Sequence, residues 1–225
     1  MREGPLSLFT AYAGAGSRLL RGCSESGRTA HMPRTLLLCM LLGACTATRE
    51  LPPVADPAAA WQARNAKLAT LETWRLEGRI GVVTEEDGGS ATLHWQQSPQ
   101  SYEIELFGPF GSGRVRLYGN DTTAVLETSE GEALYAGSAE ALFEQGLGWP
   151  VPVEPLRRWV LGLSDANDAF ELDRQGRLAT LTHDRWQVNF LAYRDVEGFD
   201  LPRKLAMHTD GLNIKLVVHE WQLHP

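Results

Sequence analysis

The chain has few cysteines and no long hydrophobic run. Its three cysteines are Cys23, Cys39 and Cys45, and the first two lie within or before a short apolar segment. If that segment is removed, only Cys45 remains, so no disulfide can stabilise the fold and a hydrophobic core must do so. The apolar run over residues 35–44 has ten residues, whereas a transmembrane helix needs about 20. A membrane-spanning helix is therefore not expected there.

Sequence motifs that mark common active sites are also missing. There is no Gly-x-Ser-x-Gly elbow, no His-Glu-x-x-His, no Cys/His metal-ligand spacing and no glycine-rich phosphate loop. The later histidines stand singly in strand-like segments, where surface or structural roles are the usual ones. We predict no catalytic residue, no metal site and no cofactor, although a concealed acid/base pair stays open. The histidines concerned are His94, His183, His208, His219 and His224.

Positive charge is scarce after residue 44. The chain has 21 basic and 28 acidic residues, and residues 1–44 hold five of the basic residues but only two of the acidic ones. The remainder carries 16 basic and 26 acidic residues, a net charge of −10. Without a basic patch, we expect neither nucleic-acid binding nor electrostatic attraction to anionic lipid headgroups.

A short N-terminal pattern indicates export. Arg34 precedes an apolar run that ends in small residues, and this layout of charged start, apolar centre and small-residue cleavage site is typical of a secretory signal. Met32 lies directly ahead of it, so residues 32–44 are sufficient for a signal peptide. We expect residues 1–31 to be an extension upstream of the true start, or a dispensable leader.

Leu42-Gly43-Ala44-Cys45 resembles the lipobox of bacterial lipoproteins. That resemblance implies cleavage before Cys45, diacylglycerol on its thiol and an acyl group on the new amino terminus. It would also explain the single cysteine of an exported chain. A buried core helix is the competing interpretation, but it fits poorly with the proline-rich residues 45–57, which we interpret as a semi-rigid tether. A domain over residues 58–225 is then expected.

After the tether, the hydrophobic period predicts one helix and then a sheet. Asp56 suits an N-cap and Pro57 a first helical position, and Trp61, Leu68 and Leu71 recur at helical spacing. From Trp74 onward, apolar residues alternate in short segments separated by turns, which predicts an antiparallel, meandering sheet with one apolar and one solvated face. The predicted strands are residues 74–82, 91–95, 102–106, 115–117, 124–126, 170–172, 178–182, 186–192, 204–209 and 212–223.

Two short helices are predicted to interrupt this sheet. Ser138 suits an N-cap for residues 139–144, and Glu154-Pro155 begins a second helix that ends at Gly162. A sheet of this size can close into a barrel or remain an open half-barrel whose mouth is covered by helices. The aromatic residues of its apolar face would either fill the core or line a cavity for a lipid-like ligand, and both interpretations stay open.

One loop stands out between two strands, Phe107-Gly108-Pro109-Phe110-Gly111. Turn residues surround an apolar ring, and little neighbouring chain is available to bury Phe110. An exposed ring at a loop tip would suit contact with a membrane or an acyl chain. The alternative is that Phe110 folds back onto the sheet.

The chain resembles the LolB family over residues 45–225. The resemblance is carried by Leu93-His94-Trp95-Gln96-Gln97, by Gly108-Pro109-Phe110-Gly111 and most specifically by residues 149–163, where Pro-x-Pro precedes Leu-Arg-x-Trp-apolar-Leu-Gly. It implies a mainly β fold, an unclosed antiparallel β-barrel of about ten to eleven strands with helices capping an apolar cavity, as in LolA and LolB. It also implies a non-enzymatic receptor that accepts lipoproteins from the periplasmic carrier LolA and inserts them into the outer membrane.

The same resemblance assigns roles to individual residues. Cys45 would carry the lipid, with no other cofactor, and Thr46 after it is consistent with residence in the outer membrane. Phe110, where an aliphatic residue is common in the family, would form a membrane-insertion loop with Pro109 and Phe107. Candidates for the acyl cavity or its lid are Trp95, Trp159, Trp186 and Tyr193, a hypothesis because a one-residue register error exchanges the two faces of a strand.

Expected partners are LolA, the acyl chains of lipoprotein cargo and outer-membrane lipids, and the chain is expected to be a monomer. The alternative function is a lipid-binding or envelope-assembly lipoprotein of the same fold that takes no cargo from LolA.

Overall fold

The computed structural model describes residues 52–108, 113–147 and 151–224. Cys45, the signal segment 32–44, and the loop residues Pro109 and Phe110 lie outside the described residues. The predictions made for them are therefore carried forward from the sequence alone.

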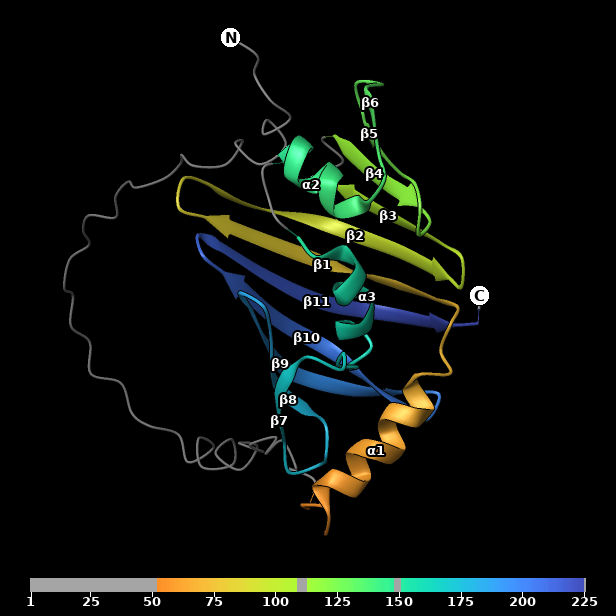
Figure 1. Ribbon diagram of the computed structural model, residues 1–225, viewed down its shortest axis with the longest axis vertical. Helices are drawn as coiled ribbons and strands as arrows, with labels where there is room; N and C mark the ends of the chain where they lie inside the picture. The colour runs from red at the N-terminus through yellow and green to blue at the C-terminus, as the bar shows by residue number, and fades with distance from the viewer. Residues whose placement is uncertain (1–51, 109–112, 148–150, 225) are drawn as a thin grey trace, which may run out of the picture. The chain divides into compact units, whose positions relative to one another are not determined.

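A single antiparallel sheet organises the described chain (Figure 1). Its eleven strands are β1 (Trp74–Thr84), β2 (Gly88–Ser98), β3 (Ser101–Phe107), β4 (Arg114–Gly119), β5 (Ala124–Thr128), β6 (Ala133–Ala136), β7 (Ala169–Leu172), β8 (Leu178–His183), β9 (Trp186–Val196), β10 (Phe199–Thr209) and β11 (Leu212–Leu223). Their order is β6-β5-β4-β3-β2-β1-β11-β10-β9-β8-β7, so the first and last strands pair at the centre. β6 and β7 form the two edges and are not paired with each other within the described residues. The unclosed, mainly β architecture predicted from the sequence is confirmed.

In most strands, alternation places the apolar side chains on one face of the sheet. The register aligns Leu76 of β1 between Trp95 of β2 and Trp221 of β11, and all three side chains are buried. Because the register of β1 against β11 shifts between Glu77 and Gly78, the apolar side chains at both ends of β11 point toward the buried face of the sheet. A Cβ at Gly78 would collide with a carbonyl oxygen of β11, so only glycine fits this close approach.

The helix α1 (Pro57–Leu68) begins as the sequence predicts. Asp56 Oδ1 accepts hydrogen bonds from the backbone N–H groups of Ala58 and Ala59, each at 3.0 Å, which satisfies two of the donors that a helix start leaves free. Trp61 is buried and its ring lies 5.4 Å from that of Phe170 on β7. Leu71 is buried too, but it lies beyond the end of α1, so the predicted helical stripe was extended too far.

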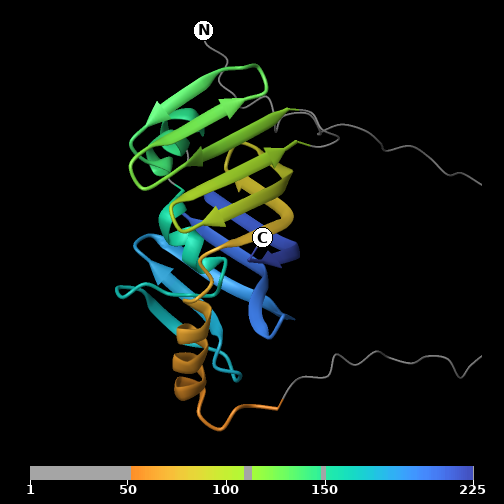
Figure 2. The same ribbon diagram turned by 90° about the vertical axis from the view of Figure 1, so that its right-hand side faces the viewer.

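The helices α2 (Ala139–Leu147) and α3 (Val153–Trp159) cover the apolar face of the sheet (Figures 1 and 2). Ser138 Oγ accepts a hydrogen bond from Ala141 N at 3.2 Å, as expected of an N-cap. α2 ends at Leu147, three residues beyond the predicted segment 139–144. The two helices are joined by a hydrogen bond from Glu154 N to Glu140 Oε1 at 2.9 Å.

The sequence pattern predicts ten of the eleven strands, and β6 is the exception. β6 has four residues, and its side chains do not alternate between buried and exposed. Tyr135 is 74% exposed and Leu134 is also exposed. Hydrophobic periodicity therefore carries no information about this strand, which pairs with β5 through its backbone.

Candidate functional site

Three tryptophans form an aromatic cluster on the covered face of the sheet. The ring of Trp74 lies 5.3 Å from that of Trp95 and 5.5 Å from that of Trp221. All three are buried, and the indole Nε1 atoms of Trp95 and Trp221 have no hydrogen-bond partner among the described residues. Trp95 was predicted as a cavity candidate. Its two partners were missed, because the pairing of β1 with both β2 and β11 is needed to bring them together.

Trp159 is the last residue of α3, Trp186 is the first residue of β9, and both are near His183. Trp159 is 0% exposed, and its ring meets that of His183 edge-on at 5.6 Å. His183 in turn pairs with Trp186 across the β8–β9 hairpin. Trp186 is also buried. The structure thus places two of the four predicted residues beside His183, in the same buried core as Trp95.

Tyr193, the fourth candidate, lies beneath the chain that follows α3. Its hydroxyl donates a hydrogen bond to Leu178 O at 2.7 Å, and the Arg177 guanidinium lies 4.6 Å from its ring centre. Burial raises the pKa of the Tyr193 phenol above its ordinary value. Gly162 has a φ of +80° and passes so close that a Cβ there would approach the tyrosine ring and Pro202. Tyr193 therefore supports the loop after α3 and is neutral at physiological pH.

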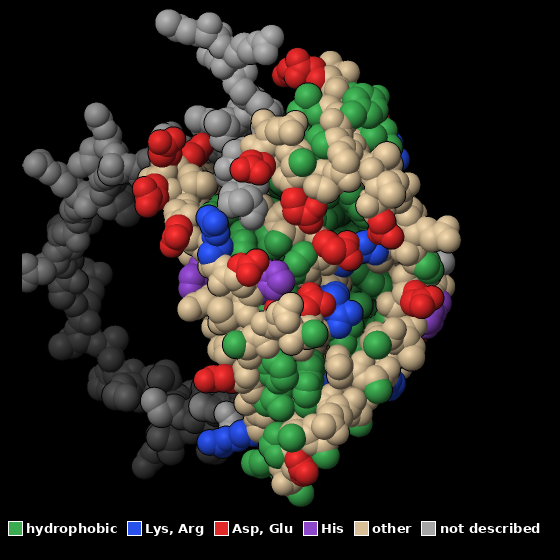
Figure 3. All heavy atoms as spheres, in the orientation of Figure 1, with side chains coloured by type: hydrophobic (Ala, Val, Ile, Leu, Met, Phe, Trp, Pro, Cys, Tyr) green, Lys and Arg blue, Asp and Glu red, His purple; other side chains and the backbone are tan. Residues whose placement is uncertain are grey.

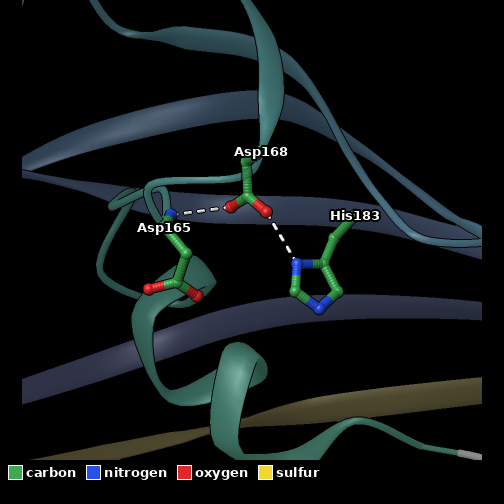
Figure 4. A group of neighbouring side chains, drawn as sticks. All are labelled: Asp165, Asp168 and His183. Atoms are coloured by element: carbon green, nitrogen blue, oxygen red, sulfur yellow. Dashed lines mark hydrogen bonds and ion pairs between the residues drawn. The ribbon is translucent and has the colours of Figure 1, made fainter.

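A network of polar groups fastens the C-terminal end of α3 to β8 (Figure 4). Asp168, whose side chain is 0% exposed, accepts a hydrogen bond from Asp165 N at 2.7 Å and lies 2.6 Å from His183 Nδ1. The Asp165 carboxylate pairs with Arg158 Nε at 2.6 Å, and Arg158 Nη2 donates to Ser164 O at 2.8 Å. These contacts span α3, the loop after it and the end of β8.

The same group contains the three side chains in the described chain that could meet around a cation. Ligand atoms of Asp165, Asp168 and His183 lie within 4.8 Å of one another. Each of these groups already has a partner: a guanidinium for Asp165, a backbone N–H for Asp168 and the Asp168 carboxylate for His183. We interpret the group as a set of structural contacts that hold the end of α3 against β8, and we call it the α3 clamp (Arg158, Asp165, Asp168 and His183).

A pocket with a volume of about 270 Å³ lies between α3, the end of α1 and the β2–β3 turn. Its apolar lining includes Leu68, Leu71, Trp74, Leu161 and Leu163, and charged residues Glu72, Glu154, Arg157 and Arg158 also line it. None of the four predicted cavity residues lines this pocket. In the space-filling view, apolar side chains gather between and below the helices, with acidic and basic residues around them (Figure 3).

The base of the predicted insertion loop is described even though its tip is not. β3 and β4 pair up to Phe107 and Arg114, and Gly108 N donates to Gly113 O at 3.2 Å. Phe107 is the last residue of β3, and its ring lies 5.2 Å from that of His94 on the solvated face. The role of Phe107 in a membrane loop remains a prediction, and it occupies a strand position rather than the loop itself.

On the solvated face, arginine and glutamate side chains link neighbouring strands. Arg116 on β4 donates two hydrogen bonds to the Glu103 carboxylate on β3, at 2.9 and 3.0 Å. The same guanidinium lies 3.6 Å from Glu127 on β5. The hydrogen bond from Arg116 holds the pKa of Glu103 below its ordinary value. Opposite charges thus face each other across this side of the sheet, as in a stable antiparallel pair.

Within the described part of the chain, no helix is long and apolar enough to cross a membrane.

Comparison with known proteins identifies the family. Residues 72–221 match the family LolB, described as outer membrane lipoprotein LolB. The chain belongs to the LolB family. The outer-membrane lipoprotein LolB of Pseudomonas putida is 40% identical over 193 residues, which cover 84% of this chain and 94% of that protein. LolB of Stutzerimonas stutzeri is 39% identical, covering 82% and 92%, and LolB of Nitrosococcus oceani is 37% identical, covering 84% and 95%.

A solved structure shares the fold at low sequence identity. A domain of an outer-membrane lipoprotein-sorting protein from Vibrio parahaemolyticus superposes with a TM-score of 0.52 at 10% identity, covering 74% of this chain and 92% of that one. The mainly β fold with an unclosed antiparallel sheet and helices is therefore shared with a solved structure.

Proposed function

We propose that this chain is a lipid-anchored outer-membrane receptor that accepts lipoproteins from the periplasmic carrier LolA and inserts them into the outer membrane. Membership of the LolB family is the observation that carries the proposal. The covered apolar face, with its buried tryptophans and two overlying helices, supports a protein that handles acyl chains.

The chemistry of the cargo explains why such a protein needs a covered apolar face. Each CH₂ group removed from water contributes about 0.8 kcal/mol, so the acyl chains of a lipoprotein would rarely leave a membrane or a carrier unshielded. A receptor that shields the chains during transfer lowers this barrier. The transfer then runs toward whichever site binds the chains more strongly, and the bilayer is the final acceptor.

In this function, each predicted residue has a part. The N-acyl and S-diacylglyceryl groups on Cys45 would hold the domain at the outer membrane, and no other cofactor or enzymatic activity is required. Phe110, at the centre of the β3–β4 loop with Pro109, would bring the cargo into contact with lipid. Trp95, Trp159, Trp186 and Tyr193 would line or support the acyl-binding face of a monomeric receptor.

The first test is transfer from the carrier. Purified LolA loaded with a labelled lipoprotein is mixed with this chain, and the two proteins are separated by affinity tags. We expect the label to move to this chain without added nucleotide. If the label stays on LolA, the receptor function is wrong and the alternative of a lipid-binding lipoprotein without hand-off is favoured.

The second test separates acceptance from insertion. Phe110→Glu places a charge on the proposed loop tip, so we expect normal acceptance from LolA and a loss of deposition into liposomes of at least tenfold. The matched control is Tyr135→Glu, which places the same charge at an exposed aromatic residue on β6. Normal deposition by Phe110→Glu would contradict the role of the loop.

A further inference from the structure

We propose that the pocket under α3 binds the polar head of the cargo, the amide-linked start of an N-acylated peptide, with Gln97 as the acceptor for an amide N–H. This inference rests on the proposed function. It adds a separate place for the head of the lipoprotein, apart from the face that handles the acyl chains.

Gln97 is a buried polar residue in a row of apolar side chains. The sheet register places it between Trp74 on β1 and Tyr102 on β3, both buried. Gln97 is 4% exposed as a whole residue, and Thr209, at 9%, is the other polar residue buried to this degree among those described. A polar group in an apolar row is unfavourable unless hydrogen bonds satisfy it.

The hydrogen bonds of Gln97 identify which end of its amide is unsatisfied. Nε2 donates to Ser98 O at 2.7 Å and to Ser101 O at 3.2 Å. Two carbonyl oxygens can face only the nitrogen end of the amide, so its orientation is fixed. The other end is therefore an acceptor, and Oε1 has no donor partner among the described residues. Gln97 is one of the residues that line the pocket, so a ligand whose N–H or O–H group reaches this oxygen from the pocket would complete its hydrogen bonding.

The charges around the pocket favour a neutral ligand. Glu72 and Glu154 balance Arg157 and Arg158 in number. Arg157 Nη1 lies 2.6 Å from Glu154 Oε2, and Arg158 pairs with Asp165 at the same distance. Both guanidinium charges are thus already compensated, and an anionic phosphate entering the pocket would meet two carboxylates. An amide, with one donor and one acceptor and no charge, suits these surroundings better.

The volume of the pocket and the presence of Trp74 in its lining suit the polar head of an acylated peptide. Its volume of about 270 Å³ corresponds to roughly nine water molecules at about 30 Å³ each, which is enough for a short peptide segment but not for three long acyl chains. Trp74 forms part of the lining and also contacts Trp95 and Trp221. A head held beside Trp74 would leave its acyl chains at the edge of the aromatic cluster.

The experiment measures how strongly the protein distinguishes an amide N–H from its methylated form. The probes are a synthetic peptide with an N-palmitoyl, S-diacylglyceryl cysteine and the same molecule with the N-acyl amide methylated. We expect the full mature chain to bind the first probe about tenfold more tightly, as one buried hydrogen bond would give. Gln97→Leu should remove this difference while binding the methylated probe within twofold of the wild type.

Thr209→Val is the matched control, because it also removes a buried oxygen without a partner but lies outside the pocket. It should keep the tenfold difference. If Gln97→Leu does not fold, as judged by circular dichroism, Gln97→Met provides the same test with an unbranched side chain of similar length. A tenfold difference that persists in the Gln97 variant, or disappears in the Thr209 variant, would overturn the role of Gln97.

The remaining outcomes separate this inference from the proposed function. Equal binding of both probes by the wild type would refute the head site and leave the receptor function intact, whereas no binding of either probe would contradict the receptor function. A short-chain phosphatidylethanolamine serves as a competing ligand. If Gln97→Leu weakens its binding while neither protein distinguishes the two peptide probes, the pocket recognises a phospholipid head and the assignment to cargo is wrong.

Discussion

Trp159→Ala tests whether α3 is packed onto the sheet as part of the core or rests loosely over a ligand space. Trp159 is 0% exposed, and its indole Nε1 has no hydrogen-bond partner among the residues that the structure describes. A buried tryptophan of about 150–250 Å² contributes roughly 4–6 kcal/mol at about 25 cal/mol per Å². Truncation of buried Trp to Ala costs about 3–5 kcal/mol in other proteins. We expect the free energy of unfolding to fall by about 3–5 kcal/mol.

The measurement is unfolding by guanidinium chloride, followed by circular dichroism so that the lost indole does not affect the signal. For a domain of this size, the same change should lower the melting temperature by roughly 6–20 °C. Trp159→Phe keeps a ring and removes the unsatisfied N–H, so we expect a smaller loss of about 1–2 kcal/mol. Tyr135→Ala, at a side chain that is 74% exposed, should change stability by less than about 0.5 kcal/mol.

A loss below about 1 kcal/mol in Trp159→Ala would refute this reasoning. It would mean that the site collapses without penalty or that α3 contributes little to the folded state. Trp159 would then be better described as a ligand-facing residue than as a packed one.

Three further predictions follow from the clamp, the charged face and the anchor. Asp168→Asn removes the charge beside His183 and replaces one of the two carboxylate oxygens by an amide N–H group. It should therefore lower the free energy of unfolding by about 1–3 kcal/mol and speed hydrogen exchange over residues 161–168. Asp184→Asn, at an exposed carboxylate, should do neither. Because the folded-state pKa of Glu103 is depressed by Arg116, its contribution is present above the unfolded-state pKa and is lost as pH falls through the folded-state pKa. Glu103→Gln should therefore destabilise at pH 7 by less than about 1 kcal/mol for this partly exposed pair, and denaturation should show no difference from wild type in strong acid. Cys45→Ala should fractionate as a soluble protein that still takes up lipoprotein from LolA, and complete loss of uptake would show that the lipid does more than tether.

Hydrophobic alternation was sufficient to predict most of the sheet. Apolar residues recur at every second position in ten of the eleven strands, and in most of these the side chains alternate between a buried and a solvated face; β7 is predicted from Phe170 and Leu172 although its residues are mostly exposed. β6 was missed because its four residues, Ala133–Ala136, are all apolar and therefore show no alternation in the sequence. The end of α1 was misplaced because Leu71, three residues beyond the last residue of the helix, is buried as Trp61 and Leu68 are, and apolar spacing alone does not distinguish this position from another turn of helix.

The candidate site was predicted less completely, because its residues come from distant parts of the chain. Trp74 and Trp221 meet only through the pairing of the first and last strands, which alternation within one strand does not reveal. The pair of Asp168 and His183 joins a loop to a strand end, and neither residue belongs to a motif. Gln97 could have been found, since it follows Leu93 and Trp95 at the same two-residue spacing and so faces inward with them.

The packing of the apolar face also bears on the direction of transfer in the proposed function. Hydrophobic affinity depends on the apolar area that a ligand newly removes from water. Trp74, Trp95 and Trp159 are already almost fully buried by their neighbours, so an acyl chain that reaches this face must displace protein contacts as well as water. The affinity gained from each CH₂ group is reduced by those lost contacts, whereas a fluid bilayer loses no comparable packing when a chain enters it. On the proposed function, binding to the receptor would therefore be weaker than insertion into the membrane, and cargo held on this face would move on to the bilayer without an energy source.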